Sequence, residues 1–274
     1  MEESFTIRTE RRGVIPVGPV RTRRGDPLGL LSRDVTWTEV AEVLVRPPLV
    51  PLSSIGSGLL RDLEGIPTDA VSQSDLAFHT LREYVPGDDL RHVHWRSSAK
   101  AMAGAGTQAL LVRQYLDTRR SHASVVVDDR PEAWRDPEDF EAAMSVAASI
   151  LVQALSDEFD VSFVCGPHLA VGADGRRALD AVCRAVPGPD GLVTAARRAA
   201  ALAPDASLAF LVTGAATGFP ELLRASSAFS PQVRSFGLVV DPEQGPRLAE
   251  AGGMPLLYLS VKEDLGALLR GSSR

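Results

Sequence analysis

The densest group of chemically reactive side chains lies between Phe78 and Lys100. This stretch, called here the signature segment, contains a Pro-Gly turn, two adjacent carboxylates, four cations, three histidines and a tryptophan. The turn spans residues 85–88, where proline presets the second position and glycine tolerates a positive φ at the third. Asp88 or Asp89 can then cap a short helix, because a carboxylate accepts hydrogen bonds from free backbone N–H groups. Such a segment could hold an anion, dock a partner or join two parts of the chain.

Three interpretations of the signature segment are open. In the first, it is a structural ion-pair network in which Leu90 and Trp95 point inward, because charge networks are more often structural than functional. The pairing groups would be Arg82, Arg91, Arg96 and Lys100 with Glu83, Asp88 and Asp89. In the second, the segment is a docking surface or an anion site. In the third, its carboxylates and histidines serve an unrecognised hydrolase.

Histidines and cysteines give weaker signals. The histidines that could bind zinc together are His79, His92, His94 and His122. No cysteine pair and no H-x-x-x-H spacing accompanies them, so we expect ordinary surface histidines. Cys165 and Cys183 lie in apolar contexts and are expected to be buried and reduced. No G-x-S-x-G motif is present. We therefore expect no catalytic residue, no bound metal and no cofactor, in a protein that is not an enzyme.

From residue 107 onward, apolar strand-like runs alternate with longer helical runs. Strands are expected at residues 109–116, 123–127, 161–164, 208–213, 235–240 and 256–261, with an extra edge strand at 168–171. Helices are expected at residues 138–158, 177–185, 192–203, 219–228, 246–251 and 264–270. The central strands are nearly all apolar, as in strands buried on both faces of a parallel sheet. The alternation predicts a doubly wound α/β sheet with helices on both faces.

The N-terminal part has a different pattern. Residues 5–10, 14–22 and 36–45 are rich in Val, Ile and Thr, are separated by Gly and Pro, and predict a small β sheet or sandwich. Residues 53–74 predict a mobile loop, and residues 101–106 predict a flexible link. The predicted organisation is a β module at 1–52, a linker loop with the signature segment at 53–106, and an α/β domain at 107–274.

The signature segment resembles a pattern of a known bacterial family. It reads F-x-x-L-R-x-Y-x-P-G-D-D-x-R-x-x-x-W-x-x-S-A-K, which is similar to the signature of the family named domain of unknown function fifty-eight. The matching residues are Phe78, Leu81, Arg82, Tyr84, Pro86, Gly87, Asp88, Asp89, Arg91, Trp95, Ser98, Ala99 and Lys100. The resemblance extends to residues 11–13, 18–20, 26–30 and 112–115 and to the strand into Asp128, so it covers most of the chain.

This resemblance implies a non-enzymatic protein-interaction adaptor. The family's C-terminal part resembles a von Willebrand factor A domain, and members usually carry two membrane helices ahead of the soluble part. They are usually associated with MoxR-type AAA+ ATPases, so the implied partner is an ATPase of that type. The implied binding residues are Arg82, Tyr84, Pro86, Gly87, Asp88, Asp89, Arg91 and Trp95. This chain would be the soluble part of a protein anchored at the cytoplasmic face of the membrane.

The von Willebrand A resemblance also implies a metal site where strands end near the topological switch point. The usual pattern is D-x-S-x-S after the first strand and an Asp in a later T-D-G loop. Here Asp128 is present, but Arg130 and Glu132 replace the two hydroxyl residues, and the loop beginning at Thr213 lacks its Asp. We expect a degenerate site in which Arg130 takes the metal position and pairs with Asp128. The alternative is a metal-dependent ligand-binding or adhesion domain, in which Asp128, Asp129 and Glu132 form a substitute carboxylate set.

Composition excludes other classes of protein. Hydrophobic residues are 45% and charged residues 23% of the chain, which argues for a globular protein and against disorder. The net charge of -6 leaves no basic footprint for nucleic acid. Residues 8–24 are locally basic, and cations beside a membrane favour its cytoplasmic face. No apolar run approaches the ~20 residues that span a bilayer, so any membrane anchor is expected outside this chain.

Overall fold

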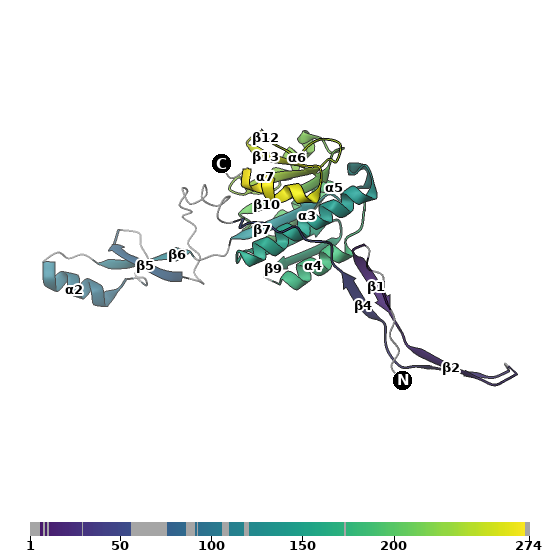
Figure 1. Cartoon of the computed structure of the whole chain (residues 1–274). Coiled ribbons are helices and arrows are strands. Elements are labelled where there is room, and N and C mark those ends of the chain that lie inside the picture. Colours follow the sequence, from purple (N-terminus) through teal and green to yellow (C-terminus); the bar gives the residue numbers. More distant parts are fainter. Residues whose placement is uncertain are drawn as a thin grey trace. The chain divides into compact units, whose positions relative to one another are not determined.

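The computed structural model describes residues 6, 7, 9, 11–28, 30–55, 76–85, 91, 93–105, 110–117, 121–172 and 174–271. The chain divides into two compact units (Figure 1). The first is formed by Met1–Glu64 with Ser121–Arg274, and the second by Gly65–Arg120. The boundaries of these units differ from those of the three predicted segments. The N-terminal strands belong to the same unit as the α/β part, and residues 107–120 belong to the unit that contains the signature segment.

A mostly parallel sheet forms the centre of the first unit. Its strands are β7 (His122–Val127), β8 (Asp160–Cys165), β9 (His168–Gly172), β10 (Leu208–Gly214), β11 (Arg234–Val240), β12 (Arg247–Ala251) and β13 (Met254–Leu259). Their order is β12-β13-β11-β10-β7-β8-β9. Only the two edge strands, β9 and β12, run antiparallel to their neighbours. The inner strands are buried along nearly their whole length, as their apolar sequences predict.

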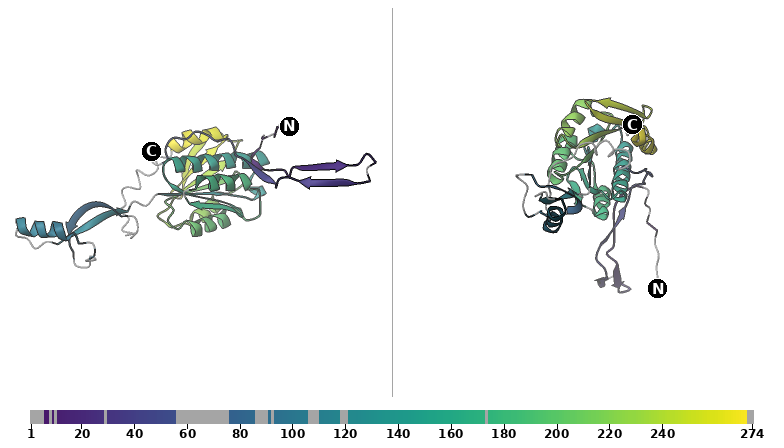
Figure 2. Two further views of the ribbon diagram at one scale, coloured as in Figure 1. Left: turned by 90° about the horizontal axis from the view of Figure 1, so that it is seen from below. Right: turned by 90° about the vertical axis from the view of Figure 1, so that its left-hand side faces the viewer.

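Helices cover both faces of this sheet (Figure 2). They are α3 (Pro137–Ser156), α4 (Gly175–Arg184), α5 (Gly191–Leu202), α6 (Phe219–Ser226) and α7 (Leu265–Gly271). Helices α3, α4 and α7 share one apolar cluster with the sheet, and α5 and α6 share the other. Successive residues of β7 point to opposite faces, so Val125 and Val127 lie in the first cluster and Val126 in the second. The predicted doubly wound α/β class is confirmed.

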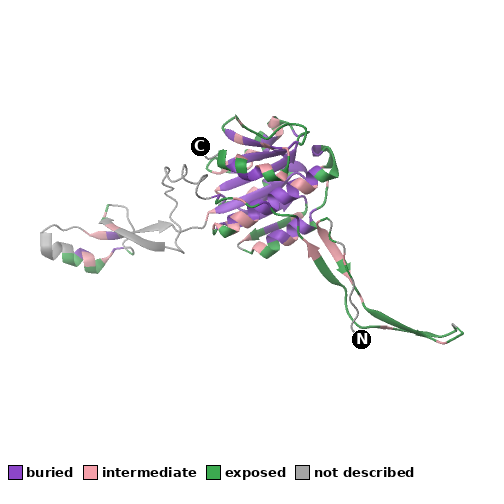
Figure 3. Ribbon diagram, viewed as in Figure 1, coloured by how far each residue is buried: buried purple, intermediate pink, exposed green. Residues whose placement is uncertain are grey.

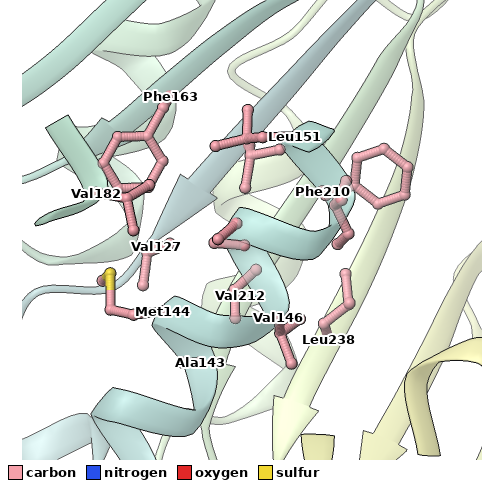
Figure 4. Close-up of a cluster of buried hydrophobic side chains, with 14 of the residues drawn as sticks. Val127, Ala143, Met144, Val146, Leu151, Phe163, Val182, Phe210, Val212 and Leu238 are labelled. Atoms are coloured by element: carbon pink, nitrogen blue, oxygen red, sulfur yellow. The ribbon is translucent and has the colours of Figure 1, made fainter. Parts of the chain in front are cut away.

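The long helix α3 is central to the first cluster. Asp136 caps its N-terminus by accepting a hydrogen bond from the Asp139 backbone at 3.0 Å, and Pro137 occupies its first turn. Its inward residues Ala143, Met144 and Val146 pack against strand side chains from β7, β8, β10 and β11 (Figure 4). The small alanines allow the helix to lie close to the sheet.

Two edge elements show where local sequence decides the strand pattern. Strand β9 is the predicted edge strand, and it pairs antiparallel with β8 after a turn at Gly166 and Pro167. Residues 246–251 were predicted as a helix, but Arg247–Ala251 form strand β12 instead. Gly252 and Gly253 both adopt positive φ, at 57° and 77°, and make the two-residue turn that folds β12 onto β13.

The predicted N-terminal β module is present, and it consists of antiparallel strand pairs. Strand β1 (Gly13–Val17) pairs with β4 (Ala41–Val45), and β2 (Arg21–Gly25) pairs with β3 (Ser32–Thr36). Among their described residues the two pairs have no buried hydrophobic side chain, so they do not form a sandwich, and β2 is exposed throughout (Figure 3). Of the predicted strand at 5–10, only residues 6, 7 and 9 are described, and they are not in a strand.

The second unit contains the signature segment. Strand β5 (Leu76–Glu83) pairs antiparallel with β6 (Leu111–Asp117), and α2 (Trp95–Ala105) lies between these strands in the sequence. The prediction of a flexible link at 101–106 is wrong, because the helix-favouring alanines there continue α2 to Ala105. Strand β6 is present where a strand was predicted, but it pairs with β5 and not with the α/β sheet. No helix in the described part of the chain is long and apolar enough to span a membrane.

Candidate functional site

The candidate site lies at the ends of β7 and β10, the two neighbouring strands at the centre of the sheet. The chain leaves β7 toward β8 on one side and leaves β10 toward β11 on the other, so this is the topological switch point. Asp128 directly follows β7, and its backbone N–H donates to the carbonyl of Val212 at 2.9 Å. The Asp128 side chain is fully buried, although it is an acid. A buried carboxylate requires a nearby cation or several hydrogen bonds.

Arg130 supplies that cation. Its Nε donates to Asp128 Oδ1 at 3.1 Å and its Nη2 donates to Asp128 Oδ2 at 2.8 Å, which is a two-pronged ion pair. Nη2 also donates to Glu221 Oε1 at 2.6 Å, and Glu221 lies in the first turn of α6. The pKa of Arg130 is raised, chiefly by its hydrogen bonds to Asp128. The predicted pairing of Arg130 with Asp128 is therefore present.

Two threonine hydroxyls complete the surroundings of Asp128. Thr213 Oγ1 lies 3.2 Å and Thr217 Oγ1 lies 3.4 Å from Asp128 Oδ2, and the two hydroxyls are 2.7 Å apart. Each hydroxyl has one hydrogen, so one threonine donates to the other, which in turn donates to the carboxylate. Together with Arg130, they leave little free acceptor capacity on Asp128.

Asp129 is buried as well, but it serves a neighbouring loop. Its Oδ1 accepts a hydrogen bond from Gly191 N at 2.7 Å, and its Oδ2 accepts one from Asp190 N at 3.3 Å. These N–H groups lie at the start of α5, where a carboxylate is stabilised by the helix dipole. A Cβ at Gly166 would approach Asp129 Oδ2 to 2.5 Å, so the backbone passes too close for any larger residue. Asp129 is a structural acceptor.

Glycine also positions Arg130. Gly191 has a φ of +75°, and a Cβ there would lie 2.8 Å from Arg130 Nε. The guanidinium thus rests against bare backbone at the start of α5. Glu132, by contrast, is exposed in a short 3-10 turn, Pro131–Ala133. The three acids of the substitute carboxylate set therefore do not converge.

The residues present do not fit a divalent cation. Such an ion needs several free oxygen ligands, but Arg130 already binds both oxygens of Asp128, and Asp129 faces backbone N–H groups. Within the described part of the chain, no three His, Cys, Asp or Glu side chains are placed to hold a metal ion. A metal-dependent ligand-binding domain does not follow from this arrangement, which presents a cation of its own.

The described histidines among the other candidate ligands lie on different elements. His94 Nδ1 accepts a hydrogen bond from Ser97 N at 3.1 Å at the start of α2, and His122 is buried on β7 beside Asp205. His79 lies on β5, and His92 lies outside the described residues. Both cysteines are buried and free, as predicted, and burial raises the pKa of Cys165 and of Cys183.

The signature segment is described only in part. Pro86, Gly87, Asp88, Asp89 and Leu90 lie outside the described residues, so the hydrolase interpretation and the capping role of the aspartates stay predictions. Arg82 lies on β5, Tyr84 follows it with its N–H bonded to the carbonyl of Leu110 at 2.7 Å, and Arg91 is exposed.

Trp95 does not point inward as predicted, because 64% of its surface is exposed. The inward positions of this segment are taken by smaller residues. Val93 bridges to Val112, and both are buried. The Ser98 hydroxyl accepts a hydrogen bond from Leu111 N at 2.8 Å, which ties α2 to the start of β6.

Comparisons with known proteins give one structural match to report. No protein-family model and no curated protein matches the chain. A solved structure described as von Willebrand factor type A from Catenulispora acidiphila is similar over 60% of this chain, with 13% sequence identity and a TM-score of 0.33. This chain spans 43% of that chain. The resemblance to domain of unknown function fifty-eight stays a prediction.

Proposed function

We propose that this chain is a non-enzymatic protein-interaction adaptor that docks its partner at the switch point, with Arg130 as the recognising cation. The proposal depends on one observation: the guanidinium of Arg130 is partly exposed and has a nitrogen without a hydrogen bond to any residue that the structure describes. The Arg130 side chain is 31% exposed, and within the described residues no hydrogen bond reaches its Nη1. A carboxylate of the partner could accept from Nη1, because arginine binds planar carboxylates in a defined geometry.

Glu221 acts in this proposal as an internal competitor. Its side chain is 22% exposed and already accepts a hydrogen bond from Nη2, and it belongs to the first turn of α6. A partner carboxylate would share or displace this contact, while Asp128 keeps the guanidinium oriented. Removing the charge of Glu221 should therefore strengthen partner binding, whereas removing Arg130 should weaken it.

The partner proposed is a MoxR-type AAA+ ATPase, and the full-length protein is proposed to be anchored at the cytoplasmic face of the membrane. Both parts rest on the resemblance of the signature segment, which supplies a second surface that includes Arg91 and the exposed Trp95. An exposed tryptophan is common among residues that anchor a protein interface.

Quantitative capture of a MoxR-type ATPase from the same genome tests the proposal. The bait is the whole chain, and its variants are Arg130→Ala, Glu221→Gln and Arg91→Ala, each checked for folding by circular dichroism. We expect nucleotide-dependent binding that Arg130→Ala weakens at least tenfold, a loss of roughly 1.4 kcal/mol or more. Arg176→Ala is the matched control, because Arg176 is exposed on α4 away from the switch point. Absence of binding in every nucleotide state would overturn the ATPase partnership, and equal loss in the control would overturn the role of Arg130.

A further inference from the structure

Residues 20–37 form a surface that the switch-point proposal does not use. This segment, called here the β2–β3 arm, consists of the β2–β3 hairpin and its connecting turn. Three leucines at the turn are almost fully exposed: Leu28 by 80%, Leu30 by 78% and Leu31 by 76%. Single exposed leucines are ordinary in soluble proteins, but three at one turn form an apolar tip that folding leaves in water.

The turn at the tip is held by hydrogen bonds of Asp26. Asp26 Oδ1 accepts a hydrogen bond from Leu31 N at 2.6 Å, Oδ2 accepts one from Leu28 N at 3.3 Å, and Asp26 N donates to Leu31 O at 3.1 Å. The hydrogen bond from Leu31 is the main cause of the lowered pKa of Asp26. These three hydrogen bonds fix the backbone of the turn from inside, while the three leucine side chains are exposed. Each backbone group that is hydrogen-bonded within the turn lowers the cost of placing the turn in an apolar medium.

The strand positions next to the tip carry a charge conflict. Arg24 and Arg33 are directly opposite in the β2–β3 register. Like charges in that position destabilise a strand pair. On the other face of the same hairpin, Arg23 and Asp34 form an ion pair at 2.8 Å, so the sequence resolves the equivalent problem there. Neither Arg24 nor Arg33 forms an ion pair with any residue that the structure describes. An unfavourable pair of like charges that the fold does not require indicates a function that needs both arginines.

We propose that the tip of the β2–β3 arm docks on the surface of an anionic lipid bilayer. The three leucines would enter the acyl boundary, and Arg24 and Arg33 would meet the lipid phosphates. Apolar side chains flanked by cations are the combination that binds anionic membrane surfaces. A protein groove would also accept the leucines, but it would not by itself account for two unpaired cations in a chain with a net charge of -6. The inference does not rest on the switch-point function.

Vesicle flotation of the whole chain tests this docking. One set of vesicles contains phosphatidylcholine only, and in the other part of it is replaced by phosphatidylglycerol. We expect binding to the anionic vesicles only, and weaker binding as salt is raised. Arg24→Gln with Arg33→Gln should weaken binding roughly twenty-five-fold, about fivefold for each cation. Leu28→Ser with Leu30→Ser and Leu31→Ser should abolish it.

Matched variants control for loss of charge and of exposed leucine elsewhere. Arg176→Gln with Arg197→Gln removes two exposed arginines from α4 and α5, and Leu169→Ser with Leu223→Ser and Leu248→Ser removes three exposed leucines outside the arm. Both control proteins should bind vesicles as the unchanged chain does. Equal weakening in the controls, or no binding of the unchanged chain to anionic vesicles, would overturn the proposal. Self-association that the three tip substitutions abolish, without vesicle binding, would instead place the tip on a second copy of the chain.

A probe at the tip reports insertion directly. Both native cysteines are buried, so Leu28→Cys offers a selectively labelled thiol for an environment-sensitive fluorophore. Its emission should shift to the blue on anionic vesicles and be quenched by spin-labelled lipid chains. The same label at Thr194→Cys, an exposed position on α5, should show neither change. Binding without any change at residue 28 would overturn insertion of the tip.

Discussion

Arg130 solves the problem of a buried acid in an unusual place. Asp128 has no exposed surface, and in water-excluded surroundings an unpaired carboxylate is costly. Here the cation is Arg130, which lies only two residues after Asp128 in the chain and balances the charge of its carboxylate. The guanidinium keeps its charge at every physiological pH, because arginine does not lose its proton in proteins.

Removal of the guanidinium should change what this edge binds. In an Arg130→Ser variant, Asp128, Thr213, Thr217 and Glu221 would all offer oxygen atoms, and the new serine would add another. We expect magnesium or manganese to stabilise this variant and to leave the unchanged chain unaffected. Metal at a hundred times its dissociation constant would add about 2.7 kcal/mol to the free energy of unfolding.

Thermal unfolding with and without metal measures this gain, and Arg130→Ser combined with Asp128→Asn is the control. The added amide should abolish the metal effect, because it removes the central anionic ligand. A metal-dependent shift of the unchanged chain, or no shift in the single variant, would contradict this account of the site.

His122 makes the stability of the first unit depend on pH. It is 4% exposed at the start of β7, and burial lowers its pKa, although the carboxylates of Asp205 and Asp160 oppose the shift. The folded chain then binds this proton more weakly than the unfolded chain does. The contribution of His122 is present above its unfolded pKa of about 6.5 and is lost as the pH falls below it.

We therefore expect the free energy of unfolding to fall as the pH drops through the range below roughly 6.5, with a slope from this group of at most about 1.4 kcal/mol per pH unit. Urea unfolding across that range should show a shallower slope in His122→Asn. The same slope in both proteins would assign the pH dependence to other groups.

The Arg130–Asp128 pair was predictable from the sequence, because the two residues are close along the chain and follow a strand that is easily recognised. Thr217 and Glu221 were missed for the opposite reason. Their place beside Asp128 depends on where β10 ends and α6 begins, and short sequence patterns do not fix such boundaries. The glycines at 166, 188 and 191 mark backbone that passes close to Asp129 and Arg130, but they give no signal for Thr217 or Glu221.

Among the elements, the β1–β4 pair is attached to the helices of the α/β unit by Arg12. Arg12 Nη1 donates to the carbonyls of Val182 and Ala185 at 2.7 and 2.6 Å, at the C-terminal end of α4. Its Nη2 donates to Glu141 on α3 at 3.1 Å, and its guanidinium lies over the ring of Phe140. A cation at a helix C-terminus is stabilised by the free carbonyls and the helix dipole.

Arg12→Ala should destabilise the first unit by roughly 2–4 kcal/mol, because it removes a buried cation and leaves two carbonyls and a carboxylate without their donor. Hydrogen exchange should become faster in β1 and β4 before it does in the central sheet. The substitution Arg12→Lys should rescue only part of the loss, because one ammonium cannot reach both carbonyls and Glu141 in the same geometry.

The neighbouring Arg11 is the matched control. It pairs with Glu138, but both side chains are more than half exposed, so Arg11→Ala should change the free energy of unfolding by no more than about 0.5 kcal/mol. Equal effects of the two alanine substitutions would contradict the anchoring role of Arg12.

Strand pairing shows how far sequence patterns reach at this scale. The apolar inner strands and the helices between them were predictable, because burial on two faces leaves an unbroken apolar run. Strand β12 was not, since five residues of mixed polarity fit a helix as well as a strand. Its pairing with β13 is decided by the turn at Gly252 and Gly253. Strand β6 was found but assigned to the wrong sheet, because local pattern does not reveal a partner.

At the scale of the whole molecule, the second unit interrupts the first. All seven strands of the central sheet come from residues after Arg120. The β1–β4 pair, which precedes the second unit in the sequence, is held to the helices by Arg12 and by the ion pair of Arg184 with Glu42. The signature segment lies in the inserted unit, with β5, β6 and α2. This division separates two of the interpretations of the signature segment: a structural network that the fold needs, and a surface for a partner.

Replacing residues 65–120 with a flexible Gly/Ser linker tests between them. If the signature segment is a docking surface, the shortened chain should keep its far-ultraviolet circular dichroism and unfold in one transition. Its free energy of unfolding should lie within about 1 kcal/mol of the first unit in the whole chain, because lengthening or shortening a flexible loop changes closure entropy only slightly. The shortened chain should at the same time lose any partner contact made through Arg91 or Trp95. A collapse of the α/β unit on removal of the insert would show that the signature segment is a structural network.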